Sequence, residues 1–202
     1  MSDIQTRKKV LRKRLLTERR RLSNGEYAFK SRRITSRILE IPELQSAHYI
    51  HVFWPIVRNR EIDTRYLIKE LTLMGKKCVL PRVLSYSNTP TNSKRMEHCL
   101  YSGETNLKPN RWDVYEPVSS ETVPVASFDL VVVPALAVDS AGIRLGYGKG
   151  YYDEFLTEIN ALTICPVFNS FFVNELPTES HDVPVDILVT EQDVVRLERN
   201  AT

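Results

Sequence analysis

Glycine and cationic residues are concentrated in one stretch, residues 144–153, which reads RLGYGKGYYD. The chain contains seven glycines, and four of them fall between Gly142 and Gly150. Glycine permits tight backbone turns and leaves peptide N–H groups open to an anion. Arg144 and Lys149 add two positive charges to the same stretch. This combination predicts a phosphate-binding loop.

The glycine spacing differs from that of two well-known phosphate loops. A P-loop places Ser or Thr after its Lys, whereas Gly150 follows Lys149 here. A dinucleotide loop reads G-x-G-x-x-G, and here the glycines alternate as G-x-G-x-G. The pattern therefore predicts phosphate binding without specifying a nucleotide, and a purely structural turn is the alternative.

Asp153 directly follows this loop. A carboxylate beside a bound phosphate would repel it unless a divalent cation lay between them, and Mg²⁺ commonly binds one or two carboxylates together with phosphate oxygens. The alternative is an acid that only stabilises the start of a helix. The residue types leave both interpretations open.

Two elements are expected to hold the loop. Residues 128–134 form a β-branched apolar run typical of a strand buried on both faces. Residues 152–162 place apolar side chains at helical spacing. The predicted order is strand, glycine loop and helix, with the positive end of the helix dipole adding to the attraction for an anion.

The rest of the chain predicts an α/β fold. A strand over 48–55, a helix over 64–74 capped by Asp63 and ended by Gly75, and a strand over 77–81 follow the βαβ order that produces a parallel sheet. Further strands are expected over 95–101, 162–168 and 186–190, with a short helical or loop segment over 171–176, irregular chain over 111–117 and an exposed loop over 86–93. Glu61 follows the first strand, where a ligand-binding role and a plain surface position are both open.

The first 40 residues are strongly basic. They carry a net charge of +9, against −6 for the remainder. An apolar stripe from Ile4 to Leu22 predicts one helix, and the S-x-x-E pattern from Ser23 to Glu26 caps a second. Lys8 and Arg12 are four residues apart, so both project from one helix face toward a common polyanion. A solvated helix face and a nucleic-acid-binding arm are the alternatives.

Composition predicts a single domain over 1–202. With 42% hydrophobic and 26% charged residues, the chain has the composition of a soluble globular protein. The longest apolar run, from Leu130 to Val138, is too short to span a bilayer. Its three cysteines lack the spacing of a disulfide framework or a zinc site. We therefore expect a cytoplasmic protein without a membrane segment.

The segment 134–153 closely resembles the signature of the 5-formyltetrahydrofolate cyclo-ligase family, also called methenyltetrahydrofolate synthetases. Other parts of the chain resemble that family in the same order: Lys8 with Arg12, residues 61–64, residues 80–82, Trp112 followed by residues 116–117, and residues 181–191. The resemblance covers nearly the whole chain. It implies a three-layer α/β/α sandwich with a mostly parallel sheet, preceded by two N-terminal helices.

The resemblance also implies a reaction. In this family ATP, with Mg²⁺, phosphorylates the formyl oxygen of 5-formyltetrahydrofolate; N10 then attacks, and 5,10-methenyltetrahydrofolate, ADP and phosphate are released. Phosphorylation makes the formamide carbon a better electrophile and its oxygen a better leaving group. Such chemistry needs positioning and charge stabilisation rather than a protein nucleophile.

The same resemblance assigns roles to residues. Lys149 and Arg144 are expected to be catalytic, with Lys149 stabilising the transferring phosphate, and Asp153 and Asp186 to hold Mg²⁺. The residues expected to bind ATP are Lys8, Arg12, Arg144, Leu145, Gly146, Tyr147, Gly148, Lys149, Gly150, Tyr151 and Tyr152. Those expected to bind the folate are Ile56, Glu61, Trp112, Tyr147, Gly148, Lys149, Gly150 and Tyr151, with Glu61 anchoring the pterin.

The expected partner is a small folate, including polyglutamylated forms, with no nucleic acid or membrane partner, and the expected state is a monomer. Two alternatives remain. A nucleic-acid-binding protein would use the basic helices but not the glycine loop, and another small-molecule kinase would use the loop with a different acceptor.

Overall fold

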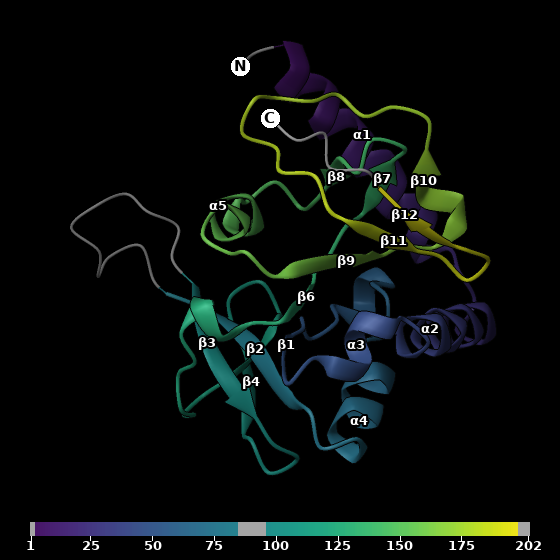
Figure 1. Ribbon diagram of the computed structural model, residues 1–202. Coiled ribbons are helices and arrows are strands. Elements are labelled where there is room, and N and C mark those ends of the chain that lie inside the picture. The colour runs from purple at the N-terminus through teal and green to yellow at the C-terminus, as the bar shows by residue number, and fades with distance from the viewer. Residues whose placement is uncertain (1–2, 85–95, 198–202) are drawn as a thin grey trace.

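The computed structural model describes residues 3–84 and 96–197, so the loop predicted over 86–93 lies outside the described residues. Within them, the central sheet has seven strands in the order β12-β11-β9-β6-β1-β2-β3 (Figure 1). Neighbouring strands from β11 to β2 are parallel, and the edge strands β12 and β3 are antiparallel to their neighbours. The predicted α/β sandwich with a mostly parallel sheet is confirmed.

The strands of the central sheet are short, and the inner ones are more buried than the edge strand β12. Their bounds are β1 Tyr49–His51, β2 Lys77–Val83, β3 Met96–Tyr101, β6 Leu130–Val132, β9 Leu162–Pro166, β11 Ile187–Val189 and β12 Val194–Arg196. β6 and β11 are buried at every position, because both faces of the sheet are covered. The expected strands over 48–55, 128–134 and 186–190 are all present, but each is shorter than predicted.

Helices pack on both faces of this sheet. α2 (Asn24–Leu39), α3 (Pro42–Ser46) and α4 (Arg65–Leu73) lie on one side, and α5 (Tyr151–Thr157) lies on the other (Figure 1). Successive side chains of a strand point to opposite faces of the sheet, so neighbouring positions contact helices on different sides. His51 on β1 faces Phe155 of α5, with ring centroids 4.8 Å apart, whereas Cys78 on β2 contacts the carbonyl of Ile68 on α4.

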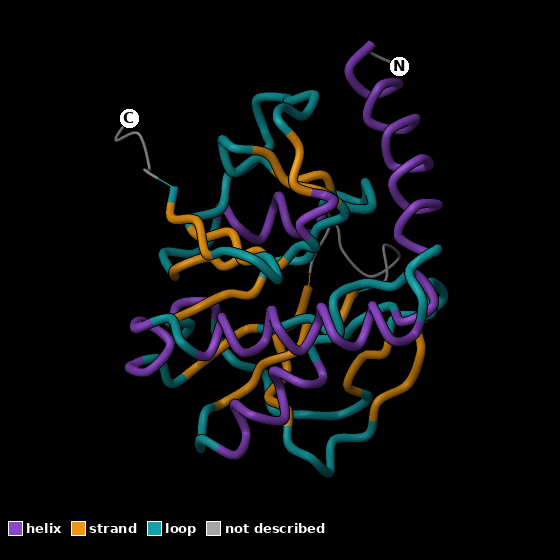
Figure 2. Tube along the Cα trace, turned by 90° about the vertical axis from the view of Figure 1, so that its right-hand side faces the viewer, coloured by secondary structure: helices purple, strands orange, loops and turns teal. Residues whose placement is uncertain are grey.

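Two helices lead the chain, as predicted. α1 (Asp3–Arg20) runs along one side of the molecule, and α2 turns away from it to cover the sheet (Figure 2). Ser23 and Glu26 form the predicted capping box at the start of α2. α4 begins one residue later than expected, so its N-cap is Thr64 and not Asp63, and Thr64 makes no side-chain cap. The Asp63 carboxylate accepts a hydrogen bond from the Arg65 amide at 3.3 Å. Gly75 follows α4 with a φ of 74°, as expected of a helix-ending glycine.

The order predicted around the glycine loop was incomplete. After β6, the chain forms β7 (Ala137–Asp139) and β8 (Arg144–Leu145), which belong with β10 (Phe172–Val173) to a separate three-stranded sheet. The glycine loop therefore leaves β8 rather than the central sheet. The following helix, α5, ends at Thr157 instead of residue 162. A hairpin at residues 137–145 was missed because its strands are too short to show a clear alternation.

A second correction concerns residues 111–117. Tyr115–Pro117 form β5, which pairs with β4 (Leu107–Pro109) in an antiparallel hairpin. Only the five connecting residues, 110–114, are irregular. Short 3₁₀ helices occur at Val57–Asn59, Val125–Ser127 and Asn169–Phe171.

Candidate active site

The glycine loop requires glycine at two positions. Gly148 and Gly150 have φ values of 82° and 74°, a region that side chains with a Cβ rarely adopt. A Cβ on Gly148 would also lie 2.8 Å from Cζ of Arg12. Gly146 has room for a Cβ, whose nearest neighbour would be Arg144 at 3.8 Å. The loop thus brings its backbone against a guanidinium.

The dipole of α5 contributes less than the sequence suggested. The helix has seven residues, and its N-cap, Gly150, makes no side-chain cap. A dipole this short is weak. The cations around the loop are therefore the main source of positive potential.

Arg12 of α1 lies across the loop. Its Nε donates to the carbonyl of Gly146 at 2.9 Å, which fixes the guanidinium beside Gly148. Burial lowers the pKa of Arg12, while the nearby charges of Asp182, Asp153 and Glu179 raise it. The structure thus brings Arg12 to the loop from more than 130 residues away in sequence.

Lys8 is placed on the same side of α1 but has other partners. Its side chain is 6% exposed, and Nζ pairs with Asp182 at 2.5 Å and Glu179 at 3.2 Å. Glu179 and Asp182 were not predicted as part of the site. Their acidic residue type alone carried no signal, since most such side chains are solvated.

Arg19 is a site residue that the sequence interpretation missed. It is 2% exposed and donates to the carbonyls of Asn59 and Ala135 and to the hydroxyl of Tyr147. Helical spacing held a signal, because Arg19 is seven residues beyond Arg12 and so shares its face. Arg19 therefore connects α1, the loop after β1 and the glycine loop.

Glu61 is buried rather than exposed. It is 3% exposed, and its carboxylate accepts a hydrogen bond from the Ile56 amide at 2.8 Å. Burial raises the pKa of Glu61, while Arg19, the Ile56 amide and the Tyr147 side chain act to lower it. Glu61 and Ile56 thus lie on the loop after β1. Tyr147 of the glycine loop is close enough to Glu61 to affect the pKa of its carboxyl group.

Arg144 and Asp153 form an ion pair across the glycine loop. Arg144 Nη2 donates to Asp153 Oδ1 at 2.7 Å, and the two side chains are 4% and 24% exposed. Within the described part of the chain, the buried Nε of Arg144 has no hydrogen-bond partner. This pair places a partly exposed carboxylate and a buried cation at opposite ends of one loop.

Asp186 has different contacts. Its carboxylate accepts hydrogen bonds from the amide and the hydroxyl of Thr163, at 2.8 and 2.7 Å. Asp153 is held by Arg144 instead, so the two carboxylates have separate partners. Among residues 3–84 and 96–197, no group of three or more His, Cys, Asp or Glu side chains is placed to hold a metal ion. The sharing of a metal by Asp153 and Asp186 stays a prediction.

Trp112 joins the site through aromatic contacts. Its ring lies 6.1 Å from the ring of Tyr151 in an edge-on arrangement, and Lys149 Nζ lies 5.7 Å above the same ring. Lys149 is exposed. The structure therefore brings together Trp112, Lys149 and Tyr151.

The remaining loop residues differ in burial, from buried Leu145 to exposed Gly148. Leu145 is 2% exposed and pairs with Ala137, so it anchors the loop in the core. Burial raises the pKa of the Tyr147 and Tyr152 hydroxyls, and the charge of Glu61 raises both further. Both tyrosines therefore stay neutral beside Glu61.

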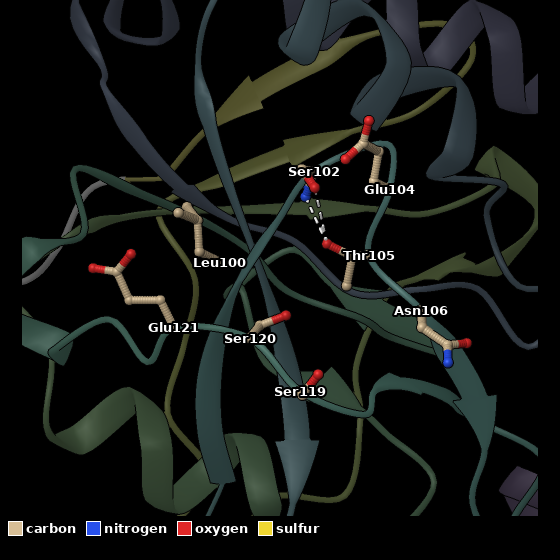
Figure 3. Close-up of a pocket in the computed structure, with 8 residues that line it drawn as sticks. All are labelled: Leu100, Ser102, Glu104, Thr105, Asn106, Ser119, Ser120 and Glu121. Atoms are coloured by element: carbon tan, nitrogen blue, oxygen red, sulfur yellow. Dashed lines mark hydrogen bonds between the residues drawn. The ribbon is translucent and has the colours of Figure 1, made fainter.

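A separate hollow of about 360 Å³ lies away from this loop, between β3 and the residues before Val123 (Figure 3). It is lined by Leu100, Ser102, Glu104, Thr105, Asn106, Ser119, Ser120 and Glu121. None of these residues belongs to the glycine loop, and its lining offers no cation for a phosphate. We therefore assign the site from side-chain chemistry and not from the size of a cavity.

Known proteins resemble this chain along most of its length. Residues 4–191 match the model of the 5-formyltetrahydrofolate cyclo-ligase family. The chain belongs to this family. It is 30% identical to the 5-formyltetrahydrofolate cyclo-ligase of Escherichia coli strain K12, over 91% of this chain and 96% of that protein. It is 29% identical to the mouse 5-formyltetrahydrofolate cyclo-ligase, over 93% of this chain and 95% of that protein.

A solved structure agrees with this assignment. The fold matches the 5,10-methenyltetrahydrofolate synthetase of Aquifex aeolicus with a TM-score of 0.82 and 31% identity, over 96% of this chain and 95% of that one. The chain is therefore an enzyme of the cyclo-ligase family. No helix in the described part of the chain is long and apolar enough to cross a membrane.

Proposed function

We propose that this enzyme converts 5-formyltetrahydrofolate to 5,10-methenyltetrahydrofolate, with ATP as the co-substrate. The observation that carries the proposal is the meeting of three distant segments at the glycine loop: Arg12 on Gly146 and Gly148, Glu61 beside Tyr147, and Trp112 against Tyr151. Membership of the family supports the reaction.

The triphosphate of ATP would lie along the glycine loop. The Arg12 guanidinium packs against the backbone at Gly148, where a Cβ would lie 2.8 Å from Cζ of Arg12, so a phosphate bound at this loop would meet a cation held against the backbone. Arg144 presents a buried Nε that has no hydrogen-bond partner among the described residues. Lys8 lies on the same face of α1 as Arg12. Its ammonium group would add positive charge to the site by contacting the phosphates as well as Glu179 and Asp182. Leu145 and the backbone from Gly146 to Tyr152 complete the ATP site.

The folate would occupy the side of the loop that faces Glu61 and Trp112. A buried carboxylate such as Glu61 suits the hydrogen-bond donors of a pterin ring. Trp112 and Tyr151 supply aromatic surface for a flat ring system, and Ile56 fixes the orientation of Glu61. The glycine loop therefore contacts both substrates.

Asp153 is the proposed Mg²⁺ ligand. Its side chain is partly exposed beside Arg144, and a hard carboxylate oxygen next to a phosphate loop is the donor that Mg²⁺ prefers. The bound ion would neutralise phosphate charge and orient the γ-phosphate. Asp186 is retained as the second predicted ligand.

The protein residues act by positioning and by charge. Lys149 extends from the loop above Trp112 and would stabilise the negative charge on the phosphoryl group while it passes to the formyl oxygen. Arg12 and Arg144 would hold the phosphates so that this transfer is in line. Phosphate then leaves when N10 of the folate attacks the activated carbon, and no covalent bond to the protein is needed.

The test is a coupled observation of product and ADP. Purified protein with MgATP and 5-formyltetrahydrofolate should form the methenyl product, followed by its near-ultraviolet absorbance, with one ADP released for each product. Omission of ATP is the control and should give no product. Folded protein that yields ADP without the methenyl product would instead favour a kinase with another acceptor, and protein that yields neither would exclude both functions.

We also infer a cytoplasmic monomer that acts on a small folate, including its polyglutamylated forms, without nucleic acid or membrane partners. Three buried free cysteines suit a reducing compartment. Lys8, Arg12 and Arg19 of α1 turn inward, which leaves fewer cations for a nucleic acid than the sequence suggested. Size-exclusion chromatography with light scattering tests the monomer.

A further inference from the structure

The hairpin of β4 and β5 ends in a turn in which the Asn110 side chain makes two hydrogen bonds, while Arg58 pairs with Asp113 at 3.3 Å. Asn110 Oδ1 accepts hydrogen bonds from the amides of Trp112 and Val114, at 2.9 and 3.2 Å. The backbone of Asn110 closes the same turn, since its amide donates to the Val114 carbonyl at 2.8 Å and its carbonyl accepts from the Asp113 amide at 2.9 Å. An asparagine that bonds the amide two residues later is a local device for fixing a turn.

This turn is also strained. Asp113 has a φ of 62°, one of two positive φ values at non-glycine residues in the described part of the chain. Such a conformation is costly unless neighbouring contacts enforce it. The three hydrogen bonds that Asn110 accepts around Trp112, Asp113 and Val114 supply that enforcement.

The side-chain nitrogen of Asn110 links the turn to the central sheet. Asn110 Nδ2 donates to Glu116 Oε1 at 2.8 Å, and that oxygen also accepts from the Val83 amide on β2 at 3.0 Å. Burial raises the pKa of Glu116, whereas the Val83 amide, Asn110 and Arg82 lower it. Asn110 thus couples the position of the turn to a rigid strand.

The turn presents Trp112 to the glycine loop. The Trp112 ring meets Tyr151 at 6.1 Å and lies under Lys149 at 5.7 Å. Arg58, on the same loop as Glu61, donates to the Trp112 carbonyl at 2.9 Å. The indole therefore lies where the loop after β1, the hairpin turn and the glycine loop approach one another.

We propose that Asn110 is a positioning residue of the active site, which fixes the Trp112 indole against Lys149 and Tyr151 and thereby sets the folate pocket and the direction of the Lys149 ammonium. The inference rests on the proposed function for its kinetic consequence only. The structural part of the inference is that Asn110 orients Trp112, and this part does not depend on any substrate.

The first test uses Trp112 as a probe. In a Trp54→Phe background Trp112 is the only tryptophan, and its emission and its quenching by acrylamide report its contacts. Asn110→Ala should shift the emission to longer wavelength and raise the quenching constant about twofold, because a ring freed from its neighbours is more exposed. Asn110→Asp keeps the acceptor oxygen for the turn but replaces the donor to Glu116 with a carboxylate oxygen, so it should restore the parent signal only in part.

A matched control is Asn106→Ala. Asn106 is exposed at the start of the same hairpin, so its variant should keep the parent fluorescence and turnover. An Asn110→Ala variant that folds and keeps the Trp112 signal of the parent would overturn the proposal. An equal shift in Asn106→Ala would do so as well, because the effect would then belong to the hairpin as a whole.

The second test is a double-mutant cycle with 5-formyltetrahydrofolate and MgATP. Asn110→Ala and Trp112→Ala should each lower kcat/KM by roughly tenfold or more, with the larger part in the folate KM. If Asn110 acts through Trp112, the double variant should be no slower than Trp112→Ala alone. Additive losses would show that Asn110 acts by another route. An inactive parent would reject the proposed function, and the fluorescence result would still decide whether Asn110 orients Trp112.

Discussion

Two clusters of largely buried polar side chains lie near Tyr152 and differ in how their polar atoms are used. The loop cluster contains Arg12, Arg19 and Arg144, whose guanidinium groups are bonded to backbone carbonyls, Tyr147 and Asp153. The imidazole cluster contains His51 and His98, whose rings pack against one another at 5.1 Å and against Phe128 and Phe155. Tyr152 has its ring 6.0 Å from His51.

The difference shows which buried polar groups indicate a site. In the loop cluster, each guanidinium makes hydrogen bonds to groups on or beside the glycine loop. In the imidazole cluster, both nitrogens of His51 and one of His98 have no hydrogen-bond partner among the described residues. Burial lowers the pKa of both histidines, that of His98 to about 4, so at neutral pH these rings are uncharged packing elements. Burial of a polar side chain is therefore weaker evidence of function than the identity of the groups to which its polar atoms are hydrogen-bonded.

The largest expected effect comes from the exposed member of the loop. Lys149→Ala should lower kcat by roughly 100- to 1,000-fold, because a cation that acts on the transferring phosphoryl group is lost. Its melting temperature should stay within about 2 °C of the parent, since an exposed side chain contributes little to the core. Steady-state kinetics and thermal denaturation measure both.

The control for Lys149→Ala is Lys69→Ala, which removes an exposed lysine on α4. It should leave kcat unchanged. If Lys149→Ala turns over at the parent rate, Lys149 has no part in the chemistry. The claim that the loop cluster marks a functional site, unlike the imidazole cluster, would then lose this support.

A smaller effect separates the two carboxylates predicted at Mg²⁺. Asp153→Asn should raise the Mg²⁺ concentration for half-maximal rate by roughly tenfold, because the proposed ligand oxygen becomes an amide. Asp186→Asn should mainly lower the melting temperature, since it disturbs the hydrogen bonds to Thr163. Initial rates over a Mg²⁺ titration, with melting curves, are the measurements.

The two outcomes of that titration are informative in different ways. Equal increases in the Mg²⁺ requirement would place Asp186 at the metal with Asp153, as the family resemblance implied. An unchanged requirement in Asp153→Asn would remove Asp153 from the metal site.

The smallest effect concerns the imidazole cluster and pH. Because burial lowers the pKa of His51 and His98, the unfolded chain binds more protons than the folded chain between pH 6.5 and about 4. Their contribution to stability is therefore complete above pH 6.5 and is lost as pH falls toward 4. The charge of Glu97 acts in the opposite direction on His98 but is the smaller influence.

Urea denaturation at pH 7, 5.5 and 4.5 tests this prediction. The parent should lose more stability over that range than a His51→Phe, His98→Phe double variant, which keeps the aromatic packing and removes both titrations. Identical losses would mean that carboxylates elsewhere account for the acid sensitivity.

Much of the fold followed from local patterns. The capping box at Ser23, the glycine after α4, the buried run in β6 and the parallel order of β1 and β2 were all predicted and confirmed. Hydrophobic periodicity and capping depend on residues close in sequence, so a single chain reveals them. The hairpins of β7 with β8 and β4 with β5 were missed, because strands of two or three residues carry almost no periodicity.

The candidate site was predicted unevenly. The glycine loop stands out by composition, and the family resemblance named Arg12, Glu61 and Trp112, which the structure brings to it. Arg19, Glu179 and Asp182 were missed, since an ordinary charged side chain gives no sign in sequence that it is buried or what it pairs with. Those facts depend on contacts across more than 100 residues.

The sequence alone located the glycine loop and predicted that it binds an anion, because closely spaced glycines with Arg144 and Lys149 stand out in composition whatever surrounds them. It also determined the α/β order of the central sheet. Only the tertiary structure decided what the loop faces: a guanidinium from α1 lies where a Cβ at Gly148 would have been, and an indole held by Asn110 lies under Lys149. The reason is physical, since burial and long-range pairing are properties of the packed chain and local sequence does not encode them.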